Sequence, residues 1–256
     1  MELRGCVSLV TGGGRRVGGA ISKSMAAQGS DLAIHYRNSR DEAESTAEEL
    51  GRLGVRVECF AADLSQPDEI EALFDSVDRA FGRLDVLVNS AASFDRGSVD
   101  EIDAEAWDRV QAVNLRAPFL CARAGASLIR SSQRDGGSPG LIANIADLSG
   151  VLSWPGYAHH GSAKAGLLHL TRVTARELAP EIRVNSVVPG PVLPPPGATF
   201  ESEEWLALCR RLPVGRGGNP SHIGDTVVFL AQNDFIVGAS IVVDGGEHLL
   251  GASHRK

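Results

Sequence analysis

The chain has 256 residues, of which 43% are hydrophobic and 22% charged, and its formal net charge at pH 7 is −7. This is the composition of an ordinary globular domain, and the mild acidity argues against a nucleic-acid partner, which requires a basic face. No apolar run approaches the roughly 18–20 residues that span a bilayer, so we expect no membrane partner. The N-terminus lacks the apolar core of a signal peptide. The cysteines, Cys6, Cys59, Cys121 and Cys209, form no CxxC pair. We therefore expect reduced thiols in a cytoplasmic protein and no metal site.

Short apolar runs alternate with longer amphipathic segments along the chain. A buried parallel strand reads as a short continuous apolar run, whereas a helix repeats its apolar positions every three to four residues. These patterns predict strands at 6–10, 31–36, 55–60, 84–89, 141–145, 182–188 and 239–246. They predict helices at 17–28, 39–54 and 67–81, two helices within 102–132, and further helices at 156–179, 201–211 and 220–231.

This alternation predicts the fold class. We expect one α/β domain over residues 1–256, a Rossmann-type doubly wound parallel sheet of about seven strands with helices on both faces. GSPG at 137–140 breaks the chain before a strand, and the prolines of 189–200 exclude regular structure there. Because irregular segments of this length are often lids, we expect a proline-rich substrate lid at about 190–212.

A glycine-rich segment, VTGGGRRVGGAI (10–21), follows the first strand and opens the first helix. It does not fit G-x-G-x-x-G, but it has the form T-G-x-x-x-R-x-G from Thr11 to Gly18. Glycines let the backbone approach a pyrophosphate, and the helix N-terminus offers free N–H groups to it. A glycine-rich turn without a ligand is the alternative.

The end of the second strand indicates which cofactor binds. NAD-binding proteins carry an acidic residue there for the ribose 2′-hydroxyl, but this chain reads HYRNS, with no acid at 35–39. Arg37 lies at this point and Arg16 lies in the glycine-rich segment. Two guanidinium groups suit a 2′-phosphate, so we predict NADP(H). Two solvated surface charges are the alternative.

Taken together, these motifs resemble the short-chain dehydrogenase/reductase superfamily over essentially the whole chain. The matching stretches are TGGGRRVG (11–18), ADLS (62–65), LVNSAA (87–92), Asn114 in AVNLRAPF, NIADLSG (144–150), GYAHHGSAK (156–164), RVNSVVPGPV (183–192) and VVDGG (242–246). Within the superfamily the chain looks most like the pteridine reductase branch. The cues are Arg16, HYRNS, SAASF (90–94), Asp147 and PVLPP (191–195).

The resemblance implies a set of cofactor-binding residues and an oligomeric state. Asp63 and Leu64 would hold the adenine, Asn89, Ala91 and Ala92 would flank the ribose, and Pro189, Gly190 and Val192 would line the nicotinamide. A homotetramer, or a homodimer, is expected through the two long central helices. The full predicted set is Gly12, Gly14, Arg15, Arg16, Val17, Gly18, Tyr36, Arg37, Asn38, Ser39, Asp63, Leu64, Asn89, Ala91, Ala92, Lys164, Pro189, Gly190 and Val192.

The catalytic motif departs from the family pattern. The family uses a tyrosine as acid, a lysine four residues later and a serine upstream, and Asn114 would belong to the proton relay. Here Lys164 is kept, but His160 takes the tyrosine position and Asp147 the serine position. Histidine can act as acid or base near neutral pH, and in the pteridine reductase pattern an aspartate helps to protonate a ring nitrogen. The predicted catalytic residues are therefore Asp147, His160, Lys164 and Asn114. For Asp147 the alternative is a turn residue that hydrogen-bonds its own backbone.

Tyr157 and the function itself leave alternatives. Tyr157 is a second candidate acid, although Pro155–Gly156 places it in the entry turn of the helix. His159 points elsewhere by helical angle and is expected at the surface or an interface. The leading hypothesis is an NADPH-dependent reductase of a ring C=N or C=O bond. The alternatives are a non-redox enzyme (elimination, cyclisation or isomerisation) with His160 as acid/base, and a catalytically silent NADP-binding protein.

The substrate pocket is expected above the C-terminal ends of the strands, where open α/β sheets bind ligands. Apolar and aromatic residues from that edge would suit a flat ring such as a pterin or an aromatic natural product, although such residues are as often ordinary packing. The predicted pocket residues are Phe94, Leu148, Trp154, Leu193, Pro194, Phe200 and Trp205.

Overall fold

The computed structural model describes residues 1–133, 138–195 and 197–250. One sheet of parallel strands runs through the described chain in the order β3-β2-β1-β4-β5-β6-β7. This confirms the predicted single Rossmann-type domain. The strands are β1 Val7–Thr11, β2 Asp31–Tyr36, β3 Val57–Ala61, β4 Val86–Asn89, β5 Gly140–Ile145, β6 Ile182–Pro189 and β7 Ser240–Val243.

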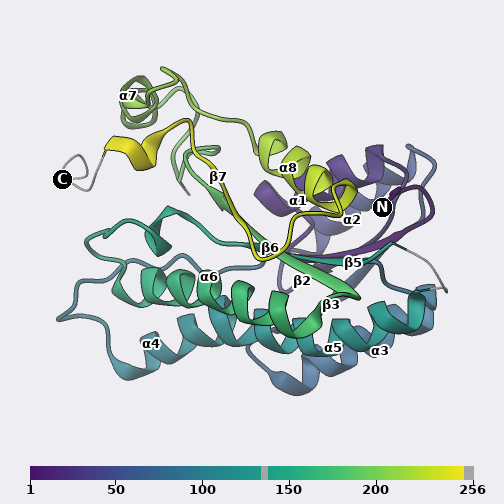
Figure 1. Cartoon of the computed structure of the whole chain (residues 1–256). Helices are drawn as coiled ribbons and strands as arrows, with labels where there is room; N and C mark the ends of the chain where they lie inside the picture. Colours follow the sequence, from purple (N-terminus) through teal and green to yellow (C-terminus); the bar gives the residue numbers. More distant parts are fainter. Residues whose placement is uncertain (134–137, 196, 251–256) are drawn as a thin grey trace.

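Helices cover both faces of the sheet (Figure 1). Helices α1, α2 and α8 lie on one face, and α3, α4, α5 and α6 lie on the other. The apolar faces of both groups pack on the central strands, which are buried on both sides. The helices are α1 Arg16–Ala27, α2 Arg40–Gly51, α3 Pro67–Phe81, α4 Ala104–Gln111, α5 Ala117–Ser132, α6 Ala158–Leu178, α7 Glu203–Arg211 and α8 Pro220–Gln232.

The observed elements agree closely with the predicted ones. Strand 31–36 and helix 67–81 have the predicted bounds, because both are flanked by clear turn or capping residues. The two helices expected within 102–132 are joined without a loop by a π-helical turn, Ala112–Arg116, and Asn114 lies in this turn. Part of the predicted break at 137–140 and one position of the lid, 196, lie outside the described residues.

The strand order reverses between β1 and β4, and this switch point places the site. The loops that follow β1 and β4 diverge there and leave a crevice at the carboxyl edge of the sheet. Among the helices of the described residues, none combines the length and the apolar character that crossing a membrane would require.

Candidate active site

A groove of about 820 Å³ opens at this switch point. The loops after β1, β2, β3 and β4 form its walls, and Arg109 and Val113 contribute from α4 and the π-helical turn. Most of the predicted cofactor residues line the groove. They are Gly12, Arg15, Arg16, Val17, Gly18, Tyr36, Arg37, Asn38, Ser39, Asp63, Leu64, Ala91 and Ala92.

Close backbone packing explains the glycines of the first loop. Gly12 has a positive φ of 64°, and a Cβ there would lie 3.2 Å from the Cα of Ala91 across the crevice. A Cβ on Gly18 would lie 2.0 Å from the carbonyl oxygen of Gly12. Gly14 serves packing, because a Cβ there would meet the Cα of Ala43 in α2 at 2.7 Å. The loop is therefore a closely packed backbone cradle without side chains at these positions, of the kind that a dinucleotide pyrophosphate can approach.

Three arginines lie along the groove, and each has a different partner. Arg15 lies 3.6 Å from Glu42, and Arg37 lies 3.9 Å from Asp63 with more than half of its side chain exposed. Arg16 adopts a positive φ of 50° and donates from Nη2 to the carbonyl oxygen of Pro194 over 3.1 Å. Arg16 thereby joins the glycine-rich loop to the proline-rich segment that follows β6.

Several predicted cofactor residues lie outside the groove. The amide of Asn89 donates to Asn144 Oδ1 over 2.9 Å, so its side chain fixes β4 to β5. Gly190 packs against Asp244, where a Cβ would approach within 2.5 Å. The complete set outside the groove is Gly14, Asn89, Lys164, Pro189, Gly190 and Val192.

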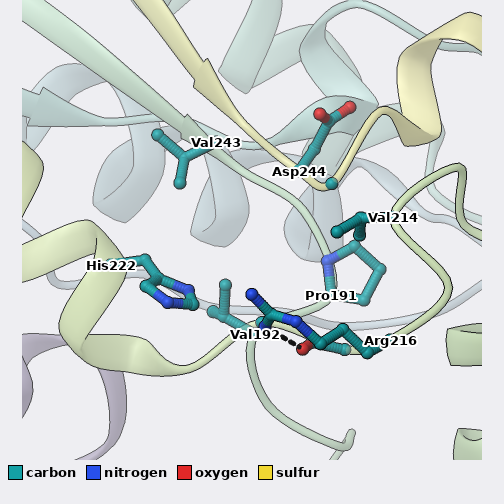
Figure 2. A pocket seen from close by; sticks show the side chains of 10 residues that line it. Pro191, Val192, Val214, Arg216, His222, Val243 and Asp244 are labelled. Atoms are coloured by element: carbon teal, nitrogen blue, oxygen red, sulfur yellow. Dashed lines mark hydrogen bonds between the residues drawn. The ribbon is translucent and has the colours of Figure 1, made fainter.

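The segment after β6 borders a second, smaller cavity of about 90 Å³ (Figure 2). Val192 lines it together with Arg216 and His222. The carboxylate of Asp244 is turned away from these two side chains (Figure 2) and accepts hydrogen bonds from the backbone of Gly246 and His248. This cavity and the main groove share none of the residues that line them.

Asp147 and His160 form a hydrogen-bonded pair at the start of α6. His160 Nε2 donates to Asp147 Oδ2 over 2.5 Å. The other carboxylate oxygen accepts from the backbone N–H of Ser149 at 2.8 Å and from its hydroxyl at 2.5 Å. The structure thus brings together Asp147 and His160, two of the predicted catalytic residues.

The second ring nitrogen of His160, Nδ1, lies near one hydrogen-bond donor and one hydrogen-bond acceptor. Nδ1 lies 3.1 Å from the amide nitrogen of Asn114, which can only donate, and 3.0 Å from the carbonyl oxygen of Ser93, which can only accept. A neutral ring accepts from Asn114, and a protonated ring donates to Ser93. The site therefore satisfies the hydrogen bonds of His160 with or without a second proton.

Hydrogen bonds and a neighbouring positive charge keep Asp147 ionised despite its burial. Burial alone would raise the pKa of Asp147, but the hydrogen bond from His160 and the positive charge of Lys164 lower it to about 2. Burial lowers the pKa of Lys164, and the negative charge of Asp147 opposes that effect. Lys164 Nζ donates to the carbonyl oxygen of Ile145 over 2.8 Å, so this residue holds the end of β5.

The two residues of the pair differ in exposure. The side chain of His160 has no exposed surface, whereas 19% of the Asp147 side chain is exposed. Phe94 closes over the imidazole edge-on, with 4.9 Å between ring centroids. His159 is also buried, because α4 covers this turn and Gln111 donates to its carbonyl oxygen; the prediction of a surface residue was wrong.

Aromatic rings gather around His160, the partner of Asp147. Tyr157 is the residue that precedes α6, as predicted, and it stacks on Phe94 with 4.8 Å between centroids. Trp154 packs against Tyr157 at 6.0 Å. Phe200 and Trp205 form a separate pair at 6.1 Å in the segment leading into α7.

Other predicted pocket residues serve packing. Leu148 is fully buried in a cluster with Leu167 and Leu168, and Trp205 retains only 6% exposure. Leu193 is half-buried and Pro194 is buried.

Sequence reasoning missed several residues that shape the groove. Thr11 Oγ1 accepts from the backbone N–H groups of Ser90 and Ala91, and so fixes the loop after β4. His35 lines the groove and contacts the glycine-rich loop. Both lie inside motifs quoted for other reasons, so the available signal was their position at a strand end. The other lining residues that were missed are Glu42, Ser65, Ser90, Ser93, Asp95, Arg109 and Val113.

Known proteins show which family the chain belongs to. A family model described as "Enoyl-(Acyl carrier protein) reductase" matches residues 14–248. The chain is 33% identical to the 3-oxoacyl-(acyl-carrier-protein) reductase FabG of Staphylococcus aureus over 94% of this chain and 98% of that protein. It is 35% identical to (3R)-3-hydroxyacyl-CoA dehydrogenase of Mus musculus, over 96% of this chain and 97% of that protein.

A solved structure extends this likeness to three dimensions. FolM alternative dihydrofolate reductase 1 from Brucella canis, complexed with NADP, superimposes with a TM-score of 0.88 at 33% identity, covering 97% of this chain and 96% of that one. The chain therefore belongs to the short-chain dehydrogenase/reductase superfamily. It is an oxidoreductase of the class that uses NAD(P) and acts on small molecules, and the glycine cradle and groove fit such a dinucleotide.

Proposed function

We propose that this protein is an NADPH-dependent reductase of a C=N bond in a flat nitrogen-containing ring of the pterin type. The observation that carries the proposal is the ionised carboxylate of Asp147, whose side chain is 19% exposed, backed by the fully buried ring of His160. A carboxylate attracts a ring N–H or a protonated ring nitrogen, and it repels the oxygen of a carbonyl that is gaining negative charge. The geometry therefore supports C=N over C=O.

The chain's own residues would move the proton as follows. NADPH, when bound, would supply the hydride for the carbon of the C=N bond. Asp147 orients the substrate through its ring nitrogen, and protonated His160 is the source of the proton, which moves from its Nε2 through the Asp147 carboxyl to that nitrogen. Asp147 is therefore an anion before and after the step, and Asn114 and the Ser93 carbonyl keep the ring of His160 in place in either protonation state.

The rim of the groove supports the preference for NADPH. Residues 35–39 contain no acidic side chain, and Arg16 and Arg37 both line the groove. Guanidinium groups suit a 2′-phosphate, which NADPH carries and NADH lacks. The solved relative that carries NADP has the same overall fold. Arg37→Asp should raise the Kd for NADPH by more than about tenfold and leave the Kd for NADH within about threefold.

The proline-rich segment at about 190–212 is proposed as a lid. Arg16 already ties Pro194 to the cofactor loop, and Phe200 is half exposed next to Trp205. The homotetramer also stays a prediction; the exposed Phe119 and Val173 on α5 and α6 are apolar residues that an interface would cover. Light scattering at micromolar concentration measures this directly.

A substrate panel tests the reaction. NADPH oxidation at 340 nm should proceed with a dihydropterin or another cyclic imine and should not proceed with quinones or cyclic ketones. Asp147→Asn should lower kcat at least about 100-fold with the imine. Turnover with ketones alone contradicts the C=N assignment. Tight NADPH binding with no turnover on any compound overturns the reductase assignment and leaves the non-redox enzyme and the silent binding protein.

Two variants separate the candidate acids. Tyr157→Phe removes the hydroxyl and keeps the stacked ring, so a loss above about 100-fold would assign the acid to Tyr157 instead of Asp147. The double variant Asp147→Ser with His160→Tyr restores the residues that relatives carry. It should lose imine reduction and gain ketone reduction, because an uncharged serine and phenol can stabilise a forming alkoxide.

A further inference from the structure

One imidazole ring connects the loop that follows β1 with the loop that follows β3, and both loops line the cofactor groove. His35, near the end of β2, accepts a hydrogen bond at Nδ1 from the backbone N–H of Gly12 over 3.1 Å. Its Nε2 lies 2.9 Å from the carbonyl oxygen of Ala62, which follows β3. The carbonyl oxygen of His35 also accepts from the N–H of Gly13 over 3.1 Å. His35 therefore holds the glycine-rich loop through both its ring and its backbone.

These contacts fix the protonation state of the ring. The Gly12 N–H can only donate, so Nδ1 must be free of a proton. The Ala62 carbonyl can only accept, so Nε2 must carry one. The side chain is 2% exposed, and water cannot replace a lost partner. His35 is consequently neutral, in a single tautomer.

The surroundings contain little charge that could hold a second proton. The residues paired with His35 in the neighbouring strands are Thr11 and Phe60, and neither is charged near neutral pH. Asp63 is the acidic group whose field favours the charged ring, and Arg37 lies 3.9 Å from its carboxylate. Burial is the larger effect and lowers the pKa of His35 below 6.5.

We propose that His35 is a positioning residue for the dinucleotide: its neutral ring holds Gly12 where the pyrophosphate binds and ties that loop to the adenine end at Ala62. Protonation would turn Nδ1 into a donor that faces another donor and would release the loop. Mild acid should therefore weaken dinucleotide binding. The inference requires only that the chain binds the dinucleotide, whatever its substrate.

Two substitutions each keep one of the two ring contacts. In His35→Asn the amide oxygen occupies the covalent position of Nδ1, so it can accept from Gly12 but loses Ala62. In His35→Gln the amide nitrogen occupies the position of Nε2, so it can donate to Ala62 but loses Gly12. A purely structural role would make both variants equally poor. A positioning role makes the Gln variant worse.

The experiment is calorimetric titration of the full-length wild type and both variants with NADP⁺, from pH 8 to pH 5. At pH 8 we expect about threefold weaker binding for His35→Asn and about tenfold weaker binding for His35→Gln. The wild-type Kd should rise at least about fivefold between pH 7 and pH 5 beyond the rise seen for His35→Asn. The Asn variant supplies the baseline because the 2′-phosphate of the nucleotide also titrates near pH 6.

The titration also counts protons. Repeated in buffers of different ionisation enthalpy near pH 5.5, wild-type binding should release a proton that His35→Asn does not release. The proposal would be overturned if the Kd for NADP⁺ rose equally for wild type and His35→Asn as the pH falls from 7 to 5. It would also be overturned if His35→Gln bound NADP⁺ as tightly as the wild type at pH 8. If His35→Gln fails to fold, the comparison of wild type with His35→Asn decides alone. Because the readout is binding, its failure is distinct from a failure to reduce any substrate.

Discussion

Asp147→Asn tests the acid/base pair through stability, independently of any substrate. The pKa of Asp147 is about 2, against 3.8 for an ordinary aspartate. At about 1.4 kcal/mol for each tenfold change in proton affinity, the native contacts favour the carboxylate by about 2 kcal/mol. The amide cannot accept from His160 and from Ser149 as the carboxylate does. The total loss should be about 2–3 kcal/mol, which lowers the Tm of a chain of this length by about 4–10 °C.

The stability difference between wild type and Asp147→Asn should depend on pH in a definite direction. A carboxylate whose pKa is lower in the folded state stabilises the protein above the pKa of the unfolded state, and this stabilisation disappears as the pH falls through the folded value. The Tm difference between wild type and Asp147→Asn should therefore be constant from pH 8 to pH 5 and shrink below about pH 4. Scanning calorimetry measures it. Asp75→Asn, an exposed position on α3, is the control and should change stability by less than about 0.5 kcal/mol. Equal Tm values at pH 7 would refute the pairing of Asp147 with His160.

Three further predictions test the loop, the lid and the core. Gly18→Ala places a Cβ 2.0 Å from the carbonyl oxygen of Gly12 and should weaken NADP⁺ binding at least about tenfold. In the control, Gly19→Ala, the new Cβ lies 3.5 Å from its nearest heavy atom, and the Kd for NADP⁺ should stay within about twofold of the wild-type value. Equal affinities of the two variants would contradict the role of this loop in binding. Arg16→Gln removes the hydrogen bond to Pro194, so proteolysis within 197–203 should be several times faster than in the control Arg15→Gln, because the wild-type Arg15 lies near Glu42 and does not bond this segment. Equal rates of proteolysis would argue against a role of the Arg16–Pro194 hydrogen bond in holding the segment. Burial raises the pKa of Cys121 to about 12, so this thiol should resist a disulfide reagent at pH 8 until guanidinium unfolds the chain; labelling faster than unfolding would show local opening.

Periodicity and turn residues predicted most of the fold because local patterns decide it. Strand 31–36 is a short apolar run between turns, and helix 67–81 begins at Pro67 and ends before Gly82, which has a positive φ. The π-helical turn at Ala112–Arg116 has no comparable local signature, since its wider ring depends on tertiary contacts such as those of Asn114.

Spacing along the chain predicted which residues form the site, but it did not predict which of their side chains is exposed. The resemblance predicted Asp147 and His160 as catalytic residues from their spacing to Lys164, and the structure places the two side chains in contact. Spacing could not show that Phe94 covers the imidazole and leaves the carboxylate exposed, because that depends on a loop more than 60 positions away. The role of His35 was hidden for a similar reason: its partners are backbone groups, which leave no trace in side-chain identity.

The pairing of β1 with β4 has a consequence for how this chain matures. Ser8 lies opposite Val86, so the switch-point crevice closes only after a long stretch of chain has been made. Non-local parallel pairing of this kind is slow, because the entropy of loop closure is lost before the contacts form. The walls of the dinucleotide groove up to Ala92 nevertheless precede His160 and Lys164 in the order of synthesis. The dinucleotide cradle and the catalytic residues thus come from successive parts of the chain, and a bound nucleotide stabilises the complete fold that brings them together.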